Sequence, residues 1–228
     1  MVKGIEHLQN AGICHRDMSL ENLLVHQNGA LIIDMGMCLR IPFETTAGSN
    51  NATGNLNSNA TYSLAASFDN LNVNGGDNVS PGAQPSLSPA TLSASPPPAW
   101  PPRARPRCLI TPQGTCGKWI YMSPEIYKNS DAFDGFAVDM WAAGVILFLM
   151  LTGFPPWERA CQTDERFRYM TAGYLVQMLT EWDIGLSGDA MDLLQRMLFL
   201  DPKDRLSLDQ VRAHPWMTNG PREPPMDF

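Results

Sequence analysis

The fold is decided by the octet His15-Arg16-Asp17-Met18-Ser19-Leu20-Glu21-Asn22 and by Asp34-Met35-Gly36, which begins twelve residues after Asn22. Two short apolar runs separate them, Leu23-Leu24-Val25 and Ala30-Leu31-Ile32-Ile33. Asn28-Gly29 lies between these runs and is a common hairpin turn. We therefore expect one small hairpin, with the octet and Asp34 at its two ends and close together in space.

These polar residue types suit phosphoryl transfer. A carboxylate such as Asp17 can accept the proton of an attacking hydroxyl group. Asn22 and Asp34 offer oxygen ligands to a metal ion that neutralises phosphate charge. An acid with an Asn five residues later and a second acid after a hairpin is therefore a specific pattern, whereas His-Arg-Asp alone is common.

Further motifs follow in a fixed order along the chain: Tyr121-Met122-Ser123-Pro124-Glu125, then Asp139-Met140-Trp141-Ala142-Ala143-Gly144, then Asp201-Pro202-Lys203-Asp204-Arg205. Together with the octet they resemble the large C-terminal lobe of a eukaryotic-type protein kinase catalytic domain of the Ser/Thr class. His214-Pro215-Trp216 looks most similar to the calcium/calmodulin-kinase branch. The fold class implied is mainly α, a helical bundle with a small β-hairpin at its active edge.

The resemblance implies a role for each motif residue. Asp17 would be the catalytic base, Asn22 and Asp34 would bind Mg²⁺, and Glu21 would lie with them beside ATP. Leu24 would lie beneath the adenine or would be plain hairpin core, and the sequence leaves both open. Arg16 would pair with a phosphate on the activation segment, and Met35 would replace the usual Phe. The structural residues would be His15, Gly36, Glu125, Asp139 and Arg205, with Asp139 holding the octet's backbone and Glu125–Arg205 forming a buried ion pair.

Ser19 and Lys118 depart from the family pattern. Ser/Thr kinases usually carry a Lys at the position of Ser19, and that Lys contacts the transferred phosphate and a Thr at the position of Lys118. Our hypothesis is an exchange, in which Lys118 supplies the missing catalytic charge and Ser19 is its hydrogen-bond partner. The alternative is a solvated Lys118 and weakened catalysis. Lys118-Trp119 is also similar to tyrosine kinases, but the octet lacks the Ala-Ala-Arg or Arg-Ala-Ala of that branch.

Composition divides the chain into four segments. Residues 1–43 would hold the catalytic loop and the metal-binding segment, and residues 108–217 the rest of the lobe, followed by a tail at 218–228. Only 8 of the 64 residues in 44–107 are Leu, Ile, Val or Phe, which predicts a disordered insertion in the activation segment. Within it, Pro98-Ala99-Trp100-Pro101-Pro102-Arg103 matches a pattern that SH3 domains bind, a weak signal in a Pro-rich segment.

Periodicity predicts the helices of the lobe. Val138–Leu151 is apolar on all sides and ends before Gly153, which predicts a buried core helix. Tyr174–Trp182 is amphipathic, and a third helix follows a Ser187 cap. Ser207-Leu208-Asp209-Gln210 is a capping box that opens a last helix through His214.

Overall composition excludes several classes of function. The net charge of −7 and the lack of a basic stripe argue against nucleic-acid binding. The longest apolar run, Met140–Leu151, is too short to span a bilayer, so we expect no membrane contact. Five scattered cysteines without a Cys-x-x-Cys pair favour a reducing compartment, cytoplasmic or nuclear.

The sequence as given contains no Gly-rich phosphate loop, strand Lys or helix Glu of a kinase small lobe, so we expect the large lobe alone. The first interpretation is a protein kinase that transfers the ATP γ-phosphate to Ser/Thr hydroxyls of a protein substrate, represented by a truncated sequence and inactive in this form. The alternative is a non-catalytic, kinase-like interaction or scaffold module that uses the Pro-rich loop.

Overall fold

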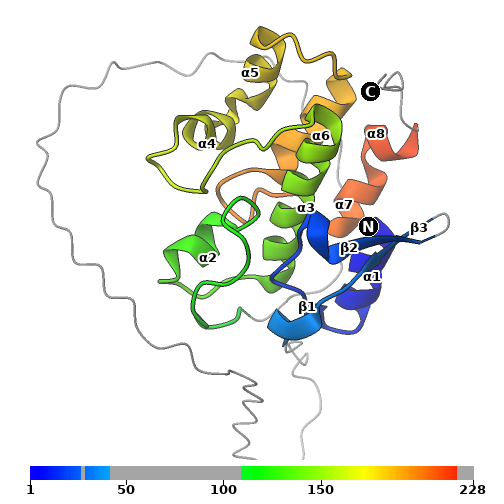
Figure 1. The fold of residues 1–228 in the computed structure, drawn as a ribbon, viewed down its shortest axis with the longest axis vertical. Coiled ribbons are helices and arrows are strands. Elements are labelled where there is room, and N and C mark those ends of the chain that lie inside the picture. Colours follow the sequence, from blue (N-terminus) through cyan, green and yellow to red (C-terminus); the bar gives the residue numbers. More distant parts are fainter. Residues whose placement is uncertain (27–28, 42–108, 220–228) are drawn as a thin grey trace, which may run out of the picture. The chain divides into compact units, whose positions relative to one another are not determined.

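Helix α3 (Gly135–Thr152) is the central element of the structure, a computed structural model that describes residues 1–26, 29–41 and 109–219. Fourteen of its 18 residues are buried, because other elements pack around it (Figure 1). The Asp134 side chain caps its first N–H groups, and Gly153 ends it in the left-handed conformation. The helix is long and apolar enough to cross a membrane, but 78% of it is buried inside the lobe, as a core helix would be.

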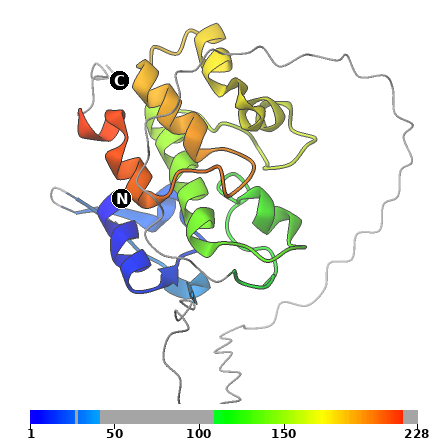
Figure 2. The same ribbon diagram turned by 180° about the vertical axis from the view of Figure 1, so that it is seen from behind.

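The remaining helices surround α3, as Figures 1 and 2 show from opposite sides. Helix α6 (Gly188–Met197) approaches closely at Gly144, where a Cβ atom would lie 3.0 Å from Met197 Cβ. A side chain at that position would force the two helices apart. The other α-helices in the described residues are α1 (Val2–Asn10), α2 (Pro124–Lys128), α4 (Glu165–Tyr169), α5 (Leu175–Glu181), α6 (Gly188–Met197), α7 (Leu208–Ala213) and α8 (Pro215–Thr218).

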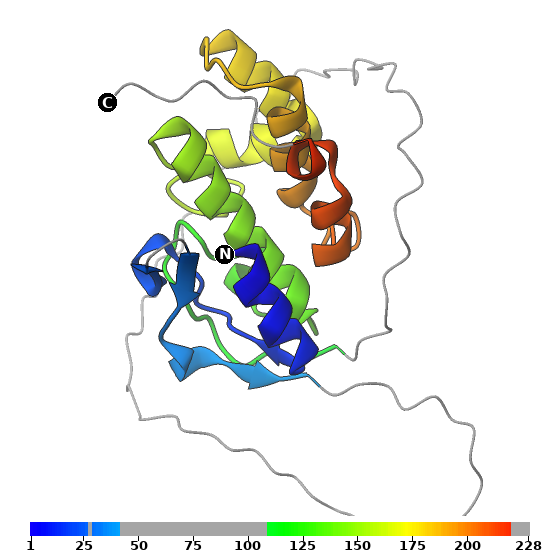
Figure 3. The same ribbon diagram turned by 90° about the vertical axis from the view of Figure 1, so that its right-hand side faces the viewer.

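Two small antiparallel sheets lie at the edge formed by the N-terminal segment (Figure 3). Strands β2 (Leu23–His26) and β3 (Gly29–Ile32) form the predicted hairpin, with His26 opposite Gly29. The turn between them lies outside the described residues. Strands β1 (Ile13–Cys14) and β4 (Leu39–Arg40) pair as well, which places the chain after Asp34 against the chain before Arg16.

The predicted helices and caps are present with small shifts. The Ser187 hydroxyl caps α6, and Ser207 and Gln210 form the complete capping box of α7. The prediction of a last helix through His214 was incomplete, because Pro215 begins α8 after an extended His214. Helix α4 and the β1–β4 pair were not predicted, because each contains only a few residues and has no period of its own. The predicted insertion at 44–107 and most of the tail lie outside the described residues.

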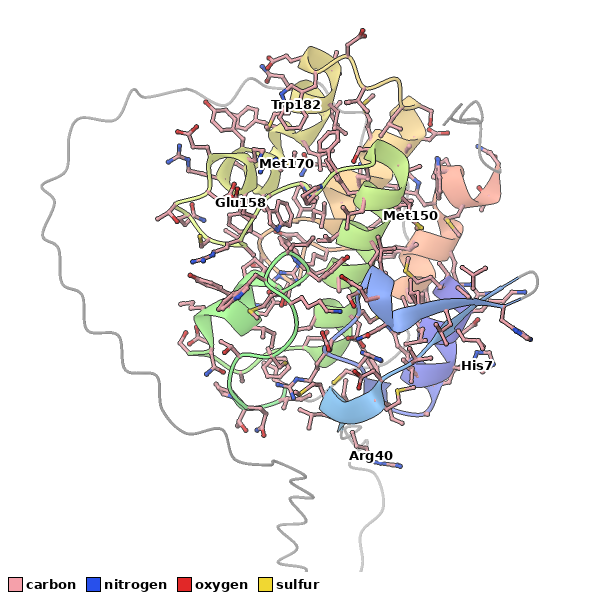
Figure 4. The ribbon with its side chains drawn as sticks, viewed as in Figure 1. His7, Arg40, Met150, Glu158, Met170 and Trp182 are labelled. Carbon is pink, nitrogen blue, oxygen red and sulfur yellow. The ribbon has the colours of Figure 1, made fainter. Side chains whose placement is uncertain are left out.

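Aromatic side chains fill the interior beside α3. The rings of Trp141 and Trp157 lie 5.2 Å apart, and Phe167 lies 5.2 Å from Trp157. Figure 4 shows Met170 and Trp182 at the end of the lobe formed by α4 and α5, and His7 and Arg40 toward the hairpin end. Helix α3 contacts both this aromatic interior, through Trp141, and the octet, through Asp139.

Candidate active site

Asp139, in the second turn of α3, fixes the backbone of the octet. Its two carboxylate oxygens accept hydrogen bonds from the backbone N–H groups of His15 (2.7 Å) and Arg16 (2.8 Å). Burial raises the pKa of Asp139 to about 6, and the two N–H donors oppose this rise. Arg16 has a positive φ of 68°, a strained conformation that these bonds stabilise. The octet is thus fixed to the most buried helix of the lobe.

The His15 ring connects the octet to the segment that carries Asp34. Its Nε2 lies 3.0 Å from the Ile33 carbonyl oxygen, and its Nδ1 lies 3.3 Å from the Asp17 backbone nitrogen. Since the carbonyl can only accept and the backbone N–H can only donate, these contacts assign a neutral ring with its proton on Nε2. His15 is fully buried, which fits the structural role expected for it.

Asp17 and Asn22 are in direct contact. The Asn22 side-chain amide donates to the Asp17 backbone carbonyl at 2.8 Å and to Asp17 Oδ2 at 3.4 Å. Asp17 Oδ1 is buried and has no hydrogen-bond partner among the residues that the structure describes. A buried carboxylate oxygen without a partner is costly, and such atoms are common where a substrate group will bind. The arrangement leaves one Asp17 oxygen able to accept a proton.

Asp34 is placed beside Asn22 by the end of the hairpin ladder, because Ile33 N donates to the Asn22 carbonyl oxygen at 2.9 Å. Asp34 is exposed and has a positive φ of 64°, and its Oδ1 accepts a bond from Gly36 N at 3.3 Å. Gly36 thus fixes the Asp34 carboxylate, as expected of a structural residue. Backbone strain of this kind is concentrated at functional sites.

The donor set fits Mg²⁺. One carboxylate and one amide oxygen are hard ligands, and Mg²⁺ completes its shell with water and substrate phosphates. Within residues 1–26, 29–41 and 109–219, no three His, Cys, Asp or Glu side chains form a metal-binding group, so a site made by protein ligands alone is not supported there. Asn22 and Asp34 are the residues that would hold the ion, which would neutralise phosphate charge when bound.

Lys118 lies against the octet, as the hypothesis of an exchange requires. Its Nζ donates to Ser19 Oγ at 2.8 Å and lies 3.2 Å from Glu21 Oε2. Ser19 is fully buried, whereas the side chains of Lys118 and Glu21 are about half exposed, at 44% and 61%. The pKa of Glu21 is lowered, first by its own backbone N–H and then by Lys118. The contact is present, and the catalytic role of Lys118 stays a prediction.

Three other predicted site residues differ from the expectation or refine it. Leu24 is 51% exposed, so its interpretation as hairpin core is wrong. Met35 is also half exposed and contacts the Cys38 thiol. The Arg16 guanidinium is buried, lies 5.7 Å from the centre of the Phe133 ring and donates to the Met37 carbonyl oxygen.

Glu125 and Arg205 form the predicted ion pair at the rear of the site. Two parallel hydrogen bonds of 2.6 and 2.7 Å join the guanidinium to the carboxylate. The Arg205 side chain is fully buried and stacks 4.7 Å from the centre of the Trp141 ring. Its remaining N–H groups donate to carbonyl oxygens of Ala137, Phe199 and Leu200. The pair therefore ties the segment after Lys118 to α3 and to the loop after α6.

Sequence reasoning missed Gly117. It has a positive φ of 87°, and a Cβ atom there would lie 3.2 Å from the Arg16 carbonyl oxygen and 3.4 Å from Asp17 Oδ1. Only glycine combines this conformation with so close an approach to another segment. The signal in the sequence is the glycine directly before Lys118.

Fold and site together define a lobe of the protein-kinase type, and comparisons with known proteins agree. Residues 106–217 match the family model described as protein kinase domain. The serine/threonine-protein kinase DCLK3 of Homo sapiens is 43% identical over 103 residues, which cover 45% of this chain and 15% of that protein. The SNF-related serine/threonine-protein kinase of Rattus norvegicus is 38% identical over 103 residues, 45% of this chain and 13% of that protein.

A calcium/calmodulin-dependent protein kinase, cmkB of Emericella nidulans, is 36% identical over 113 residues, 50% of this chain and 26% of that protein. The chain thus spans about a quarter or less of the length of these curated relatives. Residues 106–217 therefore match the protein kinase domain family, and the described part of the chain is mainly α with two small antiparallel sheets. Its relatives are serine/threonine kinases.

Proposed function

We propose that this chain is the catalytic lobe of a kinase that transfers the γ-phosphate of ATP, with Mg²⁺, to Ser or Thr hydroxyls of a protein substrate. The observation that carries the proposal is the contact of Asp17 with Asn22 while one buried Asp17 oxygen keeps no partner among the described residues. The hydrogen bond from Ile33 to Asn22 adds Asp34 to the same site. The names of the relatives favour Ser or Thr over Tyr as the acceptor.

The chemistry follows from these groups. The substrate hydroxyl oxygen forms a bond to the γ-phosphorus while the bond from that phosphorus to the β,γ-bridging oxygen breaks. The bridging oxygen keeps the electron pair and leaves as part of ADP. The hydroxyl proton moves to the Asp17 carboxylate, which Asn22 orients through its side-chain amide. Asn22 and Asp34 would hold Mg²⁺, which would neutralise phosphate charge, and Leu24 and Glu21 would lie on the nucleotide side.

The alternative function is a kinase-like interaction module without catalysis. It is favoured by exposed apolar side chains on the hairpin, where Leu24, Val25 and Leu31 are 51%, 87% and 54% exposed. Exposed apolar surface of this kind marks interaction sites. The Pro98–Arg103 segment that an SH3 domain would bind lies outside the described residues. The retained contacts of Asp17, Asn22 and Asp34 favour catalysis, since a pure scaffold has no need of them.

The test compares Asp17→Asn with the wild type in the longest protein that the native transcript encodes. Transfer of labelled γ-phosphate from ATP·Mg²⁺ to a mixed protein substrate is measured, and the labelled amino acid is identified. We expect phosphoserine or phosphothreonine, and a loss of about 10²- to 10⁴-fold in kcat for Asp17→Asn because the general base is removed. Asp131→Asn is the matched control, because this carboxylate is exposed and pairs with Lys128.

Equal rates for Asp17→Asn and the wild type would show that any transfer comes from another site. A protein that neither transfers phosphate nor binds ATP·Mg²⁺ would favour the interaction module. Labelled phosphotyrosine alone would replace the Ser/Thr assignment. We also infer an intracellular, cytoplasmic or nuclear location, which the free thiols of the four described cysteines support. Fractionation of the native cells tests this location.

A further inference from the structure

We propose that Lys118 is a catalytic residue that carries the positive charge for the γ-phosphoryl group, and that Glu21 is its replaceable counter-ion before ATP binds. This inference rests on the proposed function and names a group for the same reaction. Its basis is a cluster of three side chains in which Lys118 contacts both Ser19 and Glu21 of the octet.

The backbone of Lys118 is fixed from several directions. Its carbonyl oxygen accepts bonds from Tyr121 N and Met122 N, both at 3.0 Å. Two residues later, the Ile120 carbonyl oxygen accepts a 3.1 Å bond from the indole N–H of the fully buried Trp157. On the other side, Gly117 packs directly against Arg16 and Asp17. The segment therefore holds the Lys118 side chain on the octet, and a preorganised charge of this kind is effective in catalysis.

The two partners of Lys118 differ in character. Ser19 is fully buried and bonds the ammonium at 2.8 Å, so it fixes the position of Nζ. Glu21 is mostly exposed and lies 3.2 Å away, and an exposed ion pair of this kind contributes little to stability. A phosphate oxygen can replace the Glu21 carboxylate without displacing the Ser19 bond. Ser19 and Glu21 are thus a positioning residue and a resting counter-ion.

In the transfer step, the ammonium keeps its three protons and no bond to Lys118 forms or breaks. As the bond from the γ-phosphorus to the bridging oxygen breaks, negative charge is redistributed over the oxygens around phosphorus. An ammonium held against the octet stabilises that charge more than the ground state, which lowers the barrier. Since ADP lacks the γ-phosphate, Lys118 should distinguish ATP from ADP in binding as well as in rate.

The experiment uses the same native-length protein and three variants. For Lys118→Ala we expect kcat to fall about 100-fold, and ATP affinity to fall while ADP affinity stays constant. Lys128→Ala is the control, because Lys128 forms a similar but more exposed pair with Asp131 at 3.1 Å, and it should change neither quantity. Glu21→Gln should raise ATP affinity by about two- to fivefold without changing ADP affinity, because the counter-ion is removed.

A relocation variant separates a catalytic role from a structural one. Ser19→Lys combined with Lys118→Thr exchanges the two partners, so that the ammonium comes from position 19 and the hydroxyl from position 118. We expect this double variant to recover most of the kcat that Lys118→Ala loses. A Lys118→Ala rate equal to that of Lys128→Ala would overturn the proposal. So would a loss that the relocation variant leaves unchanged while the midpoint of thermal unfolding falls, because Lys118 would then be structural.

The outcomes also separate this proposal from the proposed function. A wild type that transfers phosphate through Asp17 but is unaffected by Lys118→Ala retains the function and removes the role of Lys118. A wild type that binds ATP without transferring phosphate still tests the inference. If Lys118→Ala loses affinity for ATP but not for ADP, the role of Lys118 is supported. If it loses affinity for both nucleotides equally, that role is refuted. A protein that binds neither nucleotide refutes both.

Discussion

The core around α3 and the hairpin edge contrast sharply in burial. Trp141, Val145 and Phe148 on α3 are fully buried, whereas Leu24, Val25 and Leu31 on the hairpin are at least half exposed. The octet His15–Asn22 contacts both regions. Asp139 on α3 anchors its backbone from the buried side, and the His15 ring connects it to Ile33, the neighbour of the exposed Asp34. The octet is therefore fixed from the buried side, whereas the hairpin face is exposed among the residues that the structure describes.

This contrast in burial separates the contacts that stabilise the fold from the groups that a substrate could reach. Buried polar contacts such as Glu125–Arg205 and Asp139 with the octet backbone stabilise the fold. Exposed groups such as Asp34 and Lys118 contribute little to stability and are available for a substrate. Substitutions on the two sides should therefore differ in kind, and the following predictions test that difference from the largest effect to the smallest.

The largest effect on stability is expected for Arg205→Ala. The variant leaves the Glu125 carboxylate without its bidentate partner and opens a space against Trp141. We expect the free energy of unfolding to fall by about 3–5 kcal/mol, because a largely buried charge loses its partner. Urea unfolding followed by tryptophan fluorescence measures it. Lys128→Ala, which breaks an exposed pair, should cost less than about 1 kcal/mol, and equal losses would contradict the contrast.

The sequence predicted the buried core better than it predicted the contacts between distant segments. The buried helices and their caps were predictable, because α3, Ser187 and Ser207 carry strong local signals. The contacts of Asp139 and of Glu125 with Arg205 were implied by the resemblance, although 124 residues separate Asp139 from His15. The β1–β4 pair, α4 and the close approach of Gly117 were not predicted. They depend on tertiary packing, which leaves no period in the sequence.

Asp139→Asn tests the link between the buried helix and the octet. Replacing one carboxylate oxygen by an amide NH₂ leaves a backbone N–H of His15 or Arg16 without an acceptor, so we expect a loss of about 1–3 kcal/mol in unfolding free energy. The backbone strain at Arg16 should then relax, and kcat should fall as Asp17 loses its position. Urea unfolding and the phosphotransfer assay measure the two effects.

The pH dependence gives a second readout on the same residue. Folding raises the pKa of Asp139 from 3.8 to about 6, so the folded state binds the proton more tightly than the unfolded state between these values. The part of the stability that arises from this raised pKa is therefore fully present below about pH 4 and is lost as the pH rises through about 6. The difference in unfolding free energy between the wild type and Asp139→Asn should shrink over that range. A difference that is constant from pH 4 to 7 would contradict the raised pKa.

The smallest effect is expected on the hairpin, where neighbouring residues face opposite ways. Ile32 packs against the core and its Cδ1 would lie 2.8 Å from a Cβ at Gly4, whereas Leu31 is 54% exposed. We expect Ile32→Ala to lower the unfolding free energy by about 1–2 kcal/mol and Leu31→Ala by less than about 0.5 kcal/mol. Measuring both in this chain and in the native-length protein sharpens the contrast. A Leu31→Ala cost that rises only in the longer protein would show that another part covers this edge, and an equal cost in both would leave the edge open for a partner or a substrate.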